Sequence, residues 1–449
     1  MVCSVHLLSV SSCIFSVLRV DHRRENKLIL NRIAVLGLYV QRFLYLFIRI
    51  LLAISYDNQM EKTKLLITCP KGLPPYLAQE LTMLGYPVID ETVAGIETEG
   101  SLDDTMQLNL SLRTAHRVLL HLKSFTAEDA ADLYTKASEI EWERYIDKNE
   151  YLSVHSSVDN PTITNPLFAN VKCKDAIVDR IKNKCGCRPD SGPEMTGAVV
   201  FLYWKGNRCS IYLDTSGEPL AKRGYRKIPL KAPMQETLAA AIVMAAGWKG
   251  SGNFINPMCG SGTIAIEAAL IALNRTPGIL RSNYGFMHIK GFDKDKWDEL
   301  RTRTKAMGTK TLNGKIIATD NNPSAIRAAR NNASTAGVEH LIEFAICDFK
   351  ETRIPAGGGV VILNPEYGER LGKQTMLENT YREIGDFFKQ KCKGYKGYIF
   401  TGNFDLIKKV GLRSKRKIPF FNSNIECRLL EYELYEGSMR VRSSNNLQT

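Results

Sequence analysis

The sequence has no cysteine pattern of the kind that binds structural zinc. Its 11 cysteines are scattered, and the tightest pair, Cys185 and Cys187, has no second pair at ligand spacing. Because zinc sites in folded domains usually combine two such pairs of Cys or His, we expect no metal. An odd number of cysteines without a recognisable secretory signal is typical of reduced thiols, so we expect a cytoplasmic protein.

An uninterrupted apolar run of membrane-spanning length is also missing. The most apolar stretch, residues 33–54, is broken by Gln41, Arg42 and Arg49, whereas a spanning helix needs about 20 predominantly apolar residues. We therefore expect no stable membrane association, with an N-terminal anchor as the alternative. Met60 precedes a clean strand pattern, so we interpret residues 1–59 as a non-native or disordered extension.

Acidic residues are outnumbered, which gives the chain a strong positive charge. There are 60 Lys and Arg against 47 Asp and Glu, a formal net charge of +13. Such a surplus favours a polyanionic partner, because neutralised phosphates release counterions; a generic basic surface is the other interpretation. The length of 449 residues is enough for two or three domains. Hydrophobic residues make up 44% of the chain, which is ordinary for globular proteins.

Residues 60–213 alternate short strands and helices, which predicts α+β modules. The expected strands are 65–69, 94–98, 117–122, 151–156, 199–204 and 208–213, and the expected helices are 76–84, 127–140 and 172–184. The last helix is amphipathic, with Lys172 and Lys174 off its apolar stripe. We interpret this half of the chain as a platform for RNA.

A basic connector, residues 214–235, separates this half from a second domain at 236–440 and a polar tail at 441–449. Its Lys222, Arg223 and Arg226 are candidate RNA contacts. Beyond it, helices alternate with apolar strands expected at 253–256, 315–319, 343–346, 359–363 and 396–401. This alternation predicts a doubly wound parallel sheet of the Rossmann-like kind.

The sharpest motif follows the first of these strands. It reads Asn-Pro-Met-Cys-Gly-Ser-Gly-Thr over residues 256–263, before an apolar helix. Gly260 and Gly262 allow a tight turn and close approach of a ligand, and the helix N-terminus suits a carboxylate such as that of S-adenosylmethionine. A tight structural turn is the alternative. The candidate cofactor residues here are Asn256, Cys259, Gly260, Ser261, Gly262 and Thr263.

Acidic residues follow the next two strands. Asp320, with Asn321 after it, ends the second strand, where a carboxylate can accept hydrogen bonds from ribose hydroxyls; the alternative is a role near the N-cap of the next helix. Asp348 ends the third strand, where it can accept from an adenine amino group, with Phe349 beside the ring.

The fourth strand leads into Asn364-Pro365-Glu366-Tyr367. The Asn364 amide oxygen and the Pro365 carbonyl can both accept hydrogen bonds from an NH₂ group, which orients its nitrogen lone pair toward a methyl donor. Tyr367 can stack on the base. A proline turn at a strand end is the alternative.

The order of these motifs resembles the amino-methylating class I methyltransferases, which carry Asn/Asp-Pro-Pro-Tyr/Phe in the catalytic loop. More narrowly, residues 171–177, 213–226 and 232–239 are similar to THUMP-domain RNA methyltransferases that form N2-methylguanosine in large-subunit ribosomal RNA. The resemblance implies a ferredoxin-like and THUMP RNA-binding region followed by a Rossmann-like methyltransferase domain. It also implies S-adenosylmethionine as cofactor, and 23S ribosomal RNA or a ribosome assembly intermediate as partner.

Two residues depart from the family pattern. Glu366 stands where the family usually has Pro, and Asn256 where it often has Asp. The alternatives to the ribosomal RNA enzyme are a transfer RNA guanine-N2 methyltransferase, a DNA N6-adenine methyltransferase and a non-catalytic RNA-binding assembly factor.

Overall fold

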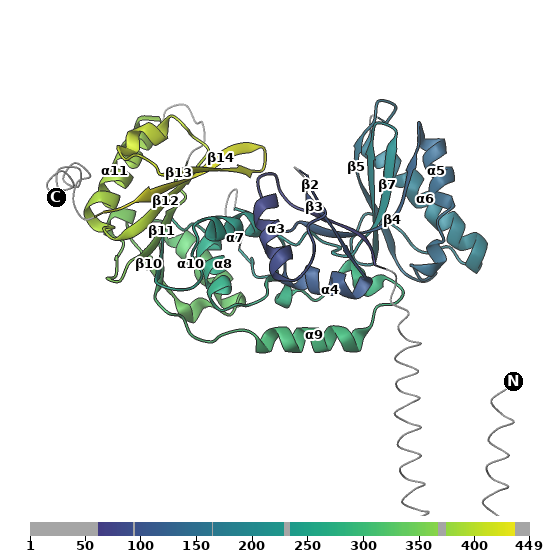
Figure 1. Cartoon of the computed structure of the whole chain (residues 1–449), viewed down its shortest axis with the longest axis horizontal. Coiled ribbons are helices and arrows are strands. Elements are labelled where there is room, and N and C mark those ends of the chain that lie inside the picture. The colour runs from purple at the N-terminus through teal and green to yellow at the C-terminus, as the bar shows by residue number, and fades with distance from the viewer. Residues whose placement is uncertain (1–61, 93–94, 164, 229–233, 367–373, 436–449) are drawn as a thin grey trace, which may run out of the picture. The chain divides into compact units, whose positions relative to one another are not determined.

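A computed structural model describes residues 62–92, 95–163, 165–228, 234–366 and 374–435, which belong to one compact unit (Figure 1). In those ranges, every helix is too short or too polar to cross a bilayer. No three potential metal-ligating side chains come together there either. The expectations for residues 1–59 and 441–449 lie outside the described residues.

The first half of the described chain forms one seven-stranded sheet with the strand order β2-β3-β1-β4-β7-β6-β5. All neighbours are antiparallel except β5 and β6, which are parallel. The strands are β1 (Thr63–Thr68), β2 (Asp90–Thr92), β3 (Gly95–Gly100), β4 (Arg117–Thr126), β5 (Leu152–Asp159), β6 (Ala198–Lys205) and β7 (Arg208–Asp214). The predicted α+β character is confirmed.

Strand β4 explains why two modules share this sheet. Its residues 117–120 pair with β1 on one side, and residues 119–126 pair with β7 on the other, with an irregularity between His121 and Lys123. Four helices accompany the sheet: α3 (Pro74–Met83), α4 (Leu102–Ser111), α5 (Ala130–Ser138) and α6 (Pro166–Cys185). Helix α6 begins at the Asn165 cap and ends at Gly186, a left-handed residue.

The second half forms another seven-stranded sheet, in the order β10-β9-β8-β11-β12-β14-β13. Its strands are β8 (Asn253–Pro257), β9 (Ile316–Asp320), β10 (Ile342–Ile346), β11 (Gly359–Leu363), β12 (Tyr395–Thr401), β13 (Arg416–Asn422) and β14 (Ile425–Glu433). The first five in this order are parallel, as predicted, whereas β13 and β14 form an antiparallel hairpin that the sequence analysis did not predict.

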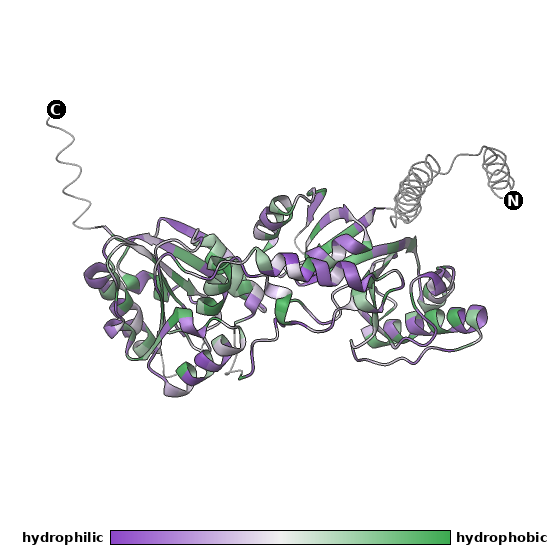
Figure 2. Cartoon of the chain, turned by 90° about the horizontal axis from the view of Figure 1, so that it is seen from below, coloured by the Kyte–Doolittle hydropathy of each residue, from purple (hydrophilic) through white to green (hydrophobic). Residues whose placement is uncertain are grey.

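Helices α7 (Glu236–Ala245), α8 (Thr263–Ala272), α10 (Pro323–Thr335) and α11 (Gln374–Lys391) accompany the second sheet, whereas α9 (Lys294–Ala306) pairs through Lys296 with Asp103 of α4. Figure 2 shows apolar residues gathered where sheets and helices meet, with hydrophilic residues on the outer helix faces. Strand β8 lies between β9 and β11, so the chain reverses its direction across the sheet there. Ligands of doubly wound sheets bind at such a switch point, beyond the carboxyl ends of the strands.

Candidate active site

The loop after β8 has a backbone that only particular residues can adopt. Met258, Gly260 and Gly262 all have positive φ, at 56°, 54° and 78°. A Cβ on Gly262 would lie 2.9 Å from the Cβ of Ala329 on α10, whereas a Cβ on Gly260 would meet no described atom within 4 Å. Gly262 is therefore required by packing, and Gly260 leaves open space beside the loop.

Helix α8 begins at Gly262 without a side-chain cap. Its first N–H groups lack intrahelical partners, and the helix dipole makes this end attractive to an anion. Ser261 and Thr263 flank the start, both less than a tenth exposed, with their hydroxyl oxygens 3.4 Å apart. The sequence therefore places an uncapped helix end, whose dipole suits an anion, at the switch point of the sheet.

Asp320 connects β9 to this loop. Its Oδ2 accepts from the Gly260 N–H (2.9 Å) and its Oδ1 from the Asn322 N–H (3.0 Å). A carboxylate oxygen has two acceptor sites, so each oxygen can take one further donor such as a ribose hydroxyl. Asn322, and not Asp320, caps α10, through the Ser324 N–H at 2.9 Å. The neighbouring Asn321 is exposed.

Cys259 is tied to the same strand, because its N–H donates to the Thr319 carbonyl at 2.9 Å. Burial, together with the nearby Asp320 carboxylate, raises the pKa of the Cys259 thiol. A protonated thiol is a weak nucleophile, so this shift argues against a covalent role, and the place of Cys259 among the cofactor residues stays a prediction.

Asp348 lies just beyond β10 and is partly exposed. Its Oδ1 accepts from the Lys350 N–H at 2.9 Å, and the Lys350 Nζ lies 3.8 Å from Oδ2. The place of Phe349 beside a bound adenine stays a prediction. The Phe349 ring is buried in the core and contacts Phe387 edge-on, with ring centroids 5.8 Å apart.

Two asparagines lie at the ends of neighbouring strands at the switch point. Asn256 is fully buried, and its Nδ2 donates to the Ile362 carbonyl of β11 at 2.9 Å. An aspartate could not make this donation, so asparagine gives the end of β8 a link to β11. Asn364 directly follows β11. Among the described residues, the buried Oδ1 atoms of Asn256 and Asn364 have no hydrogen-bond donor.

Of the residues that follow Asn364 in the catalytic loop, the structure describes Pro365 and Glu366. Pro365 is buried and Glu366 is exposed. Tyr367 lies outside the described residues, so its predicted stacking role stays a prediction.

The candidate RNA contacts divide into exposed and internal residues. Lys172 and Lys174 are partly exposed on α6. The Lys172 Nζ lies 5.7 Å from the centroid of the Phe168 ring, and Lys174 pairs with Asp175 at 3.0 Å. Lys222 is exposed and pairs with Glu218. These three lysines reach solvent, and their contact with RNA stays a prediction.

The prediction that Arg223 contacts RNA is wrong, because this residue is only 1% exposed. Its guanidinium donates to the Leu220 and Arg113 carbonyls, and its Nε lies 3.6 Å from the buried Glu267 carboxylate of α8. Tyr225 donates to the same carboxylate at 3.0 Å. A guanidinium enclosed in this way is a structural group and cannot serve as an RNA contact.

Arg226 is also mostly buried and internally paired. It donates to the Met234 carbonyl (2.6 Å) and to Thr263 Oγ1 (3.3 Å), and its Nε lies 3.1 Å from the Glu236 carboxylate. The prediction of an RNA contact is therefore replaced by a tether between the connector and the cofactor loop.

Sequence reasoning missed Asn332, which completes this tether. Its Nδ2 donates to the Ser261 carbonyl (3.2 Å) and its Oδ1 accepts from the Lys227 N–H (3.0 Å). It is 1% exposed and lies on the same face of α10 as Ala325 and Ala329. A polar residue within an apolar helical stripe is a signal that could have identified it, because buried amides need partners.

Three known domain families match successive parts of the chain. Residues 64–119 match the RlmL ferredoxin-like domain, 127–214 the THUMP domain, and 223–431 the RMKL-like methyltransferase domain. The chain is 34% identical to a Synechocystis protein named as a candidate RNA methyltransferase, over 82% of this chain and 96% of that one.

A second relative is the ribosomal RNA large subunit methyltransferase K/L of Psychromonas ingrahamii. It is 38% identical over 82% of this chain, which spans only 50% of that protein. The crystal structure of SMU.472, a candidate methyltransferase in complex with S-adenosylhomocysteine, superposes with a TM-score of 0.76. It has 25% identity and covers 84% of this chain and 99% of its own. The chain therefore belongs to the family of THUMP-domain class I methyltransferases with an RMKL-like catalytic domain.

Proposed function

We propose that this protein transfers a methyl group from S-adenosylmethionine to the exocyclic N2 of a guanine in large-subunit (23S) ribosomal RNA. The observation that carries the proposal is the Asn364 amide, which directly follows β11 at the switch point. Its buried Oδ1 has no donor among the described residues. Buried acceptors are normally satisfied, and an amino group of a substrate base would satisfy this one.

The loop after β8 fits the cofactor. The α8 N-terminus would hold the methionine carboxylate, Asp320 the ribose hydroxyls and Asp348 the adenine amino group. The open space at Gly260 gives room for close approach. The cofactor supplies an electrophilic methyl group on a sulfonium. SMU.472, which shares this fold, was crystallised with the demethylated product of that cofactor.

The chemistry needs orientation more than a strong base. The lone pair of an exocyclic amine is delocalised into the purine ring, so the amine is a poor nucleophile. The Asn364 side chain and the Pro365 carbonyl would accept its two N–H bonds and direct the lone pair toward the methyl group. Positioning and preorganised acceptors would then supply most of the rate acceleration. The sulfonium would leave as S-adenosylhomocysteine, and the cationic nitrogen would lose its proton to water.

The Glu366 side chain suits guanine better than adenine as the methylated base. Guanine carries a hydrogen on N1 beside its exocyclic amine, whereas adenine presents an acceptor at N1. An exposed carboxylate next to Pro365 can accept from the guanine N1–H and would repel the adenine lone pair. The residue that departs from the family pattern is thus compatible with the proposed base.

The proposed partner is ribosomal RNA, free or in an assembly intermediate in the cytoplasm. Support comes from the +13 net charge, the THUMP domain and the similarity to the ribosomal RNA large subunit methyltransferase K/L of Psychromonas ingrahamii. The partly exposed Lys172 and Lys174 and the exposed Lys222 would bind phosphates, which makes the affinity depend on salt.

The test is nucleoside mapping of RNA by mass spectrometry in a strain that lacks the gene. We expect one N2-methylguanosine to disappear from large-subunit RNA and to return on complementation. Loss of the nucleoside from transfer RNA instead would assign the transfer RNA substrate. Loss of N6-methyladenosine would overturn the base, and an unchanged modification map would favour an assembly factor.

A further inference from the structure

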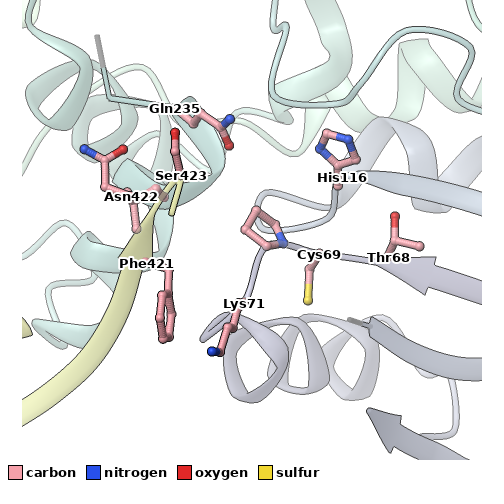
Figure 3. Close-up of a pocket in the computed structure, with 10 residues that line it drawn as sticks. Thr68, Cys69, Lys71, His116, Gln235, Phe421, Asn422 and Ser423 are labelled. Carbon is pink, nitrogen blue, oxygen red and sulfur yellow. The ribbon is translucent and has the colours of Figure 1, made fainter. Parts of the chain in front are cut away.

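A cavity of about 270 Å³ lies between the two sheets, and no described residue of the loop after β8 lines it (Figure 3). Its walls are the loop between β1 and α3, the start of α7 and the turn between β13 and β14. The lining residues are Thr68, Cys69, Pro70, Lys71, His116, Gln235, Leu238, Phe421, Asn422 and Ser423. None of these ten residues is acidic, which suits a ligand that carries negative charge.

The walls are held together by direct packing of the two halves. Tyr76 of α3 stacks on Phe420 of β13, with ring centroids 5.6 Å apart. Gly72, at φ 87°, approaches the same strand so closely that a Cβ would lie 3.3 Å from the Phe420 Cα. The His116 N–H donates to the Thr68 carbonyl at 2.7 Å. The cavity is therefore built into the fold.

The cavity lies past the catalytic edge of the second sheet. Leu363, the residue before Asn364, pairs with Ile399 of β12. Strand β12 ends at Thr401, opposite Arg428, and the hairpin continues three residues further to the Asn422–Ile425 pair. At about 3.3 Å per residue, its turn lies roughly 10 Å beyond that edge. Figure 1 shows the hairpin reaching toward α3.

The lining side chains could bind the phosphate, the base and the sugar of a nucleotide. The exposed Lys71 Nζ lies 4.1 Å from the centroid of the Phe421 ring, and Figure 3 shows the two side chains facing each other. A phosphate can pair with the ammonium while a base stacks on an aromatic ring. Asn422 and Gln235 add amides, which can bond base edges or a 2′-hydroxyl.

His116 adds a neutral donor and acceptor. Burial, together with the nearby Arg117, lowers the pKa of its imidazole to about 4. At pH 7 the ring is therefore uncharged, and one nitrogen donates while the other accepts.

We propose that this cavity binds a single-stranded nucleotide of the substrate RNA near the target base, with Phe421 as the stacking face and Lys71 as the phosphate contact. The inference rests on the proposed function. The volume of the cavity, about 270 Å³, is close to the lower end for ligand sites, about 300 Å³. RNA held on the first sheet would pass this cavity on its way to Asn364, so one nucleotide would be fixed beside the reacting one.

The test measures the affinity of the full chain for a transcript of unmodified 23S ribosomal RNA at several salt concentrations. Phe421→Ala should weaken binding about 5- to 150-fold, the range for loss of one base stack, and Phe421→Tyr should bind like wild type. Lys71→Gln should weaken binding and reduce the slope of log K against log salt by about one. The matched control is Lys305→Gln on α9, which should leave the slope nearly unchanged.

Calorimetric binding of S-adenosylmethionine separates this proposal from the proposed function. We expect all four variants to bind the cofactor like wild type. Wild-type RNA affinity and salt slope in both Phe421→Ala and Lys71→Gln would overturn the cavity proposal, even if methylation of guanine is observed. Failure of the wild-type chain to bind either cofactor or RNA would overturn the proposed function itself.

Discussion

Replacing Gly260 with leucine should abolish cofactor binding while lowering the stability of the fold only slightly. Gly260 has φ 54°, and a residue with a Cβ costs about 1–2 kcal/mol in this left-handed region. The new Cβ meets no described atom within 4 Å, so no clash is added. We therefore expect the free energy of unfolding to fall by only about 1–2 kcal/mol, while the leucine fills the space beside the loop and calorimetric binding of S-adenosylmethionine is lost.

Gly262→Ala is the matched comparison. Its Cβ would lie 2.9 Å from the Ala329 Cβ and 3.3 Å from the Ala329 Cα. Overpacking of this kind costs about 1–3 kcal/mol, in addition to the backbone cost at φ 78°. Urea denaturation should therefore show a larger stability loss for Gly262→Ala than for Gly260→Leu. A folded Gly260→Leu protein that binds the cofactor as tightly as wild type would refute the reasoning.

Three further predictions concern the catalytic loop and the connector. Asn364→Ala should lower the single-turnover methylation rate on the order of a hundred- to a thousand-fold with little change in RNA affinity; an unaltered rate would remove Asn364 from the catalytic loop. Glu366→Pro should keep at least partial activity in the same assay, since the two acceptors for the amine remain, and complete loss would show that the carboxylate is essential. Arg223→Met leaves the buried Glu267 without its cation and should reduce the free energy of unfolding by roughly 3–5 kcal/mol, whereas the exposed Lys222→Gln should change it by less than about 1 kcal/mol. Equal denaturation midpoints for these two variants would contradict the internal role of Arg223.

The parallel part of the second sheet was predictable because its strands are short apolar runs, each followed by a recognisable loop. Val361 and Ile362, for example, are fully buried, as expected for a strand covered on both faces. The loop after β8 could be recognised from its glycines, and the structure brings Gly260 and Asp320 together across two strands.

The β13–β14 hairpin escaped prediction because its apolar residues are interspersed with charged ones. Cys427 and Leu429 are buried, while Arg416 and Lys417 are exposed. Its place beside β12 depends on long-range pairing, which local sequence does not encode.

The connector arginines were misassigned for a different reason. Basic composition suggests an RNA surface, but it does not show whether a charge has a buried partner. Arg223 and Arg226 have such partners in Glu267 and Glu236, which lie on two helices of the second domain. Only the folded arrangement shows that these charges are internal.

The most direct measurement is methyl transfer from labelled S-adenosylmethionine to an unmodified 23S ribosomal RNA transcript, followed by nucleoside analysis. The proposed function predicts label in N2-methylguanosine with the wild-type chain and a strong reduction with Asn364→Ala. Label in N6-methyladenosine, or no label although the cofactor and the RNA both bind, would contradict it.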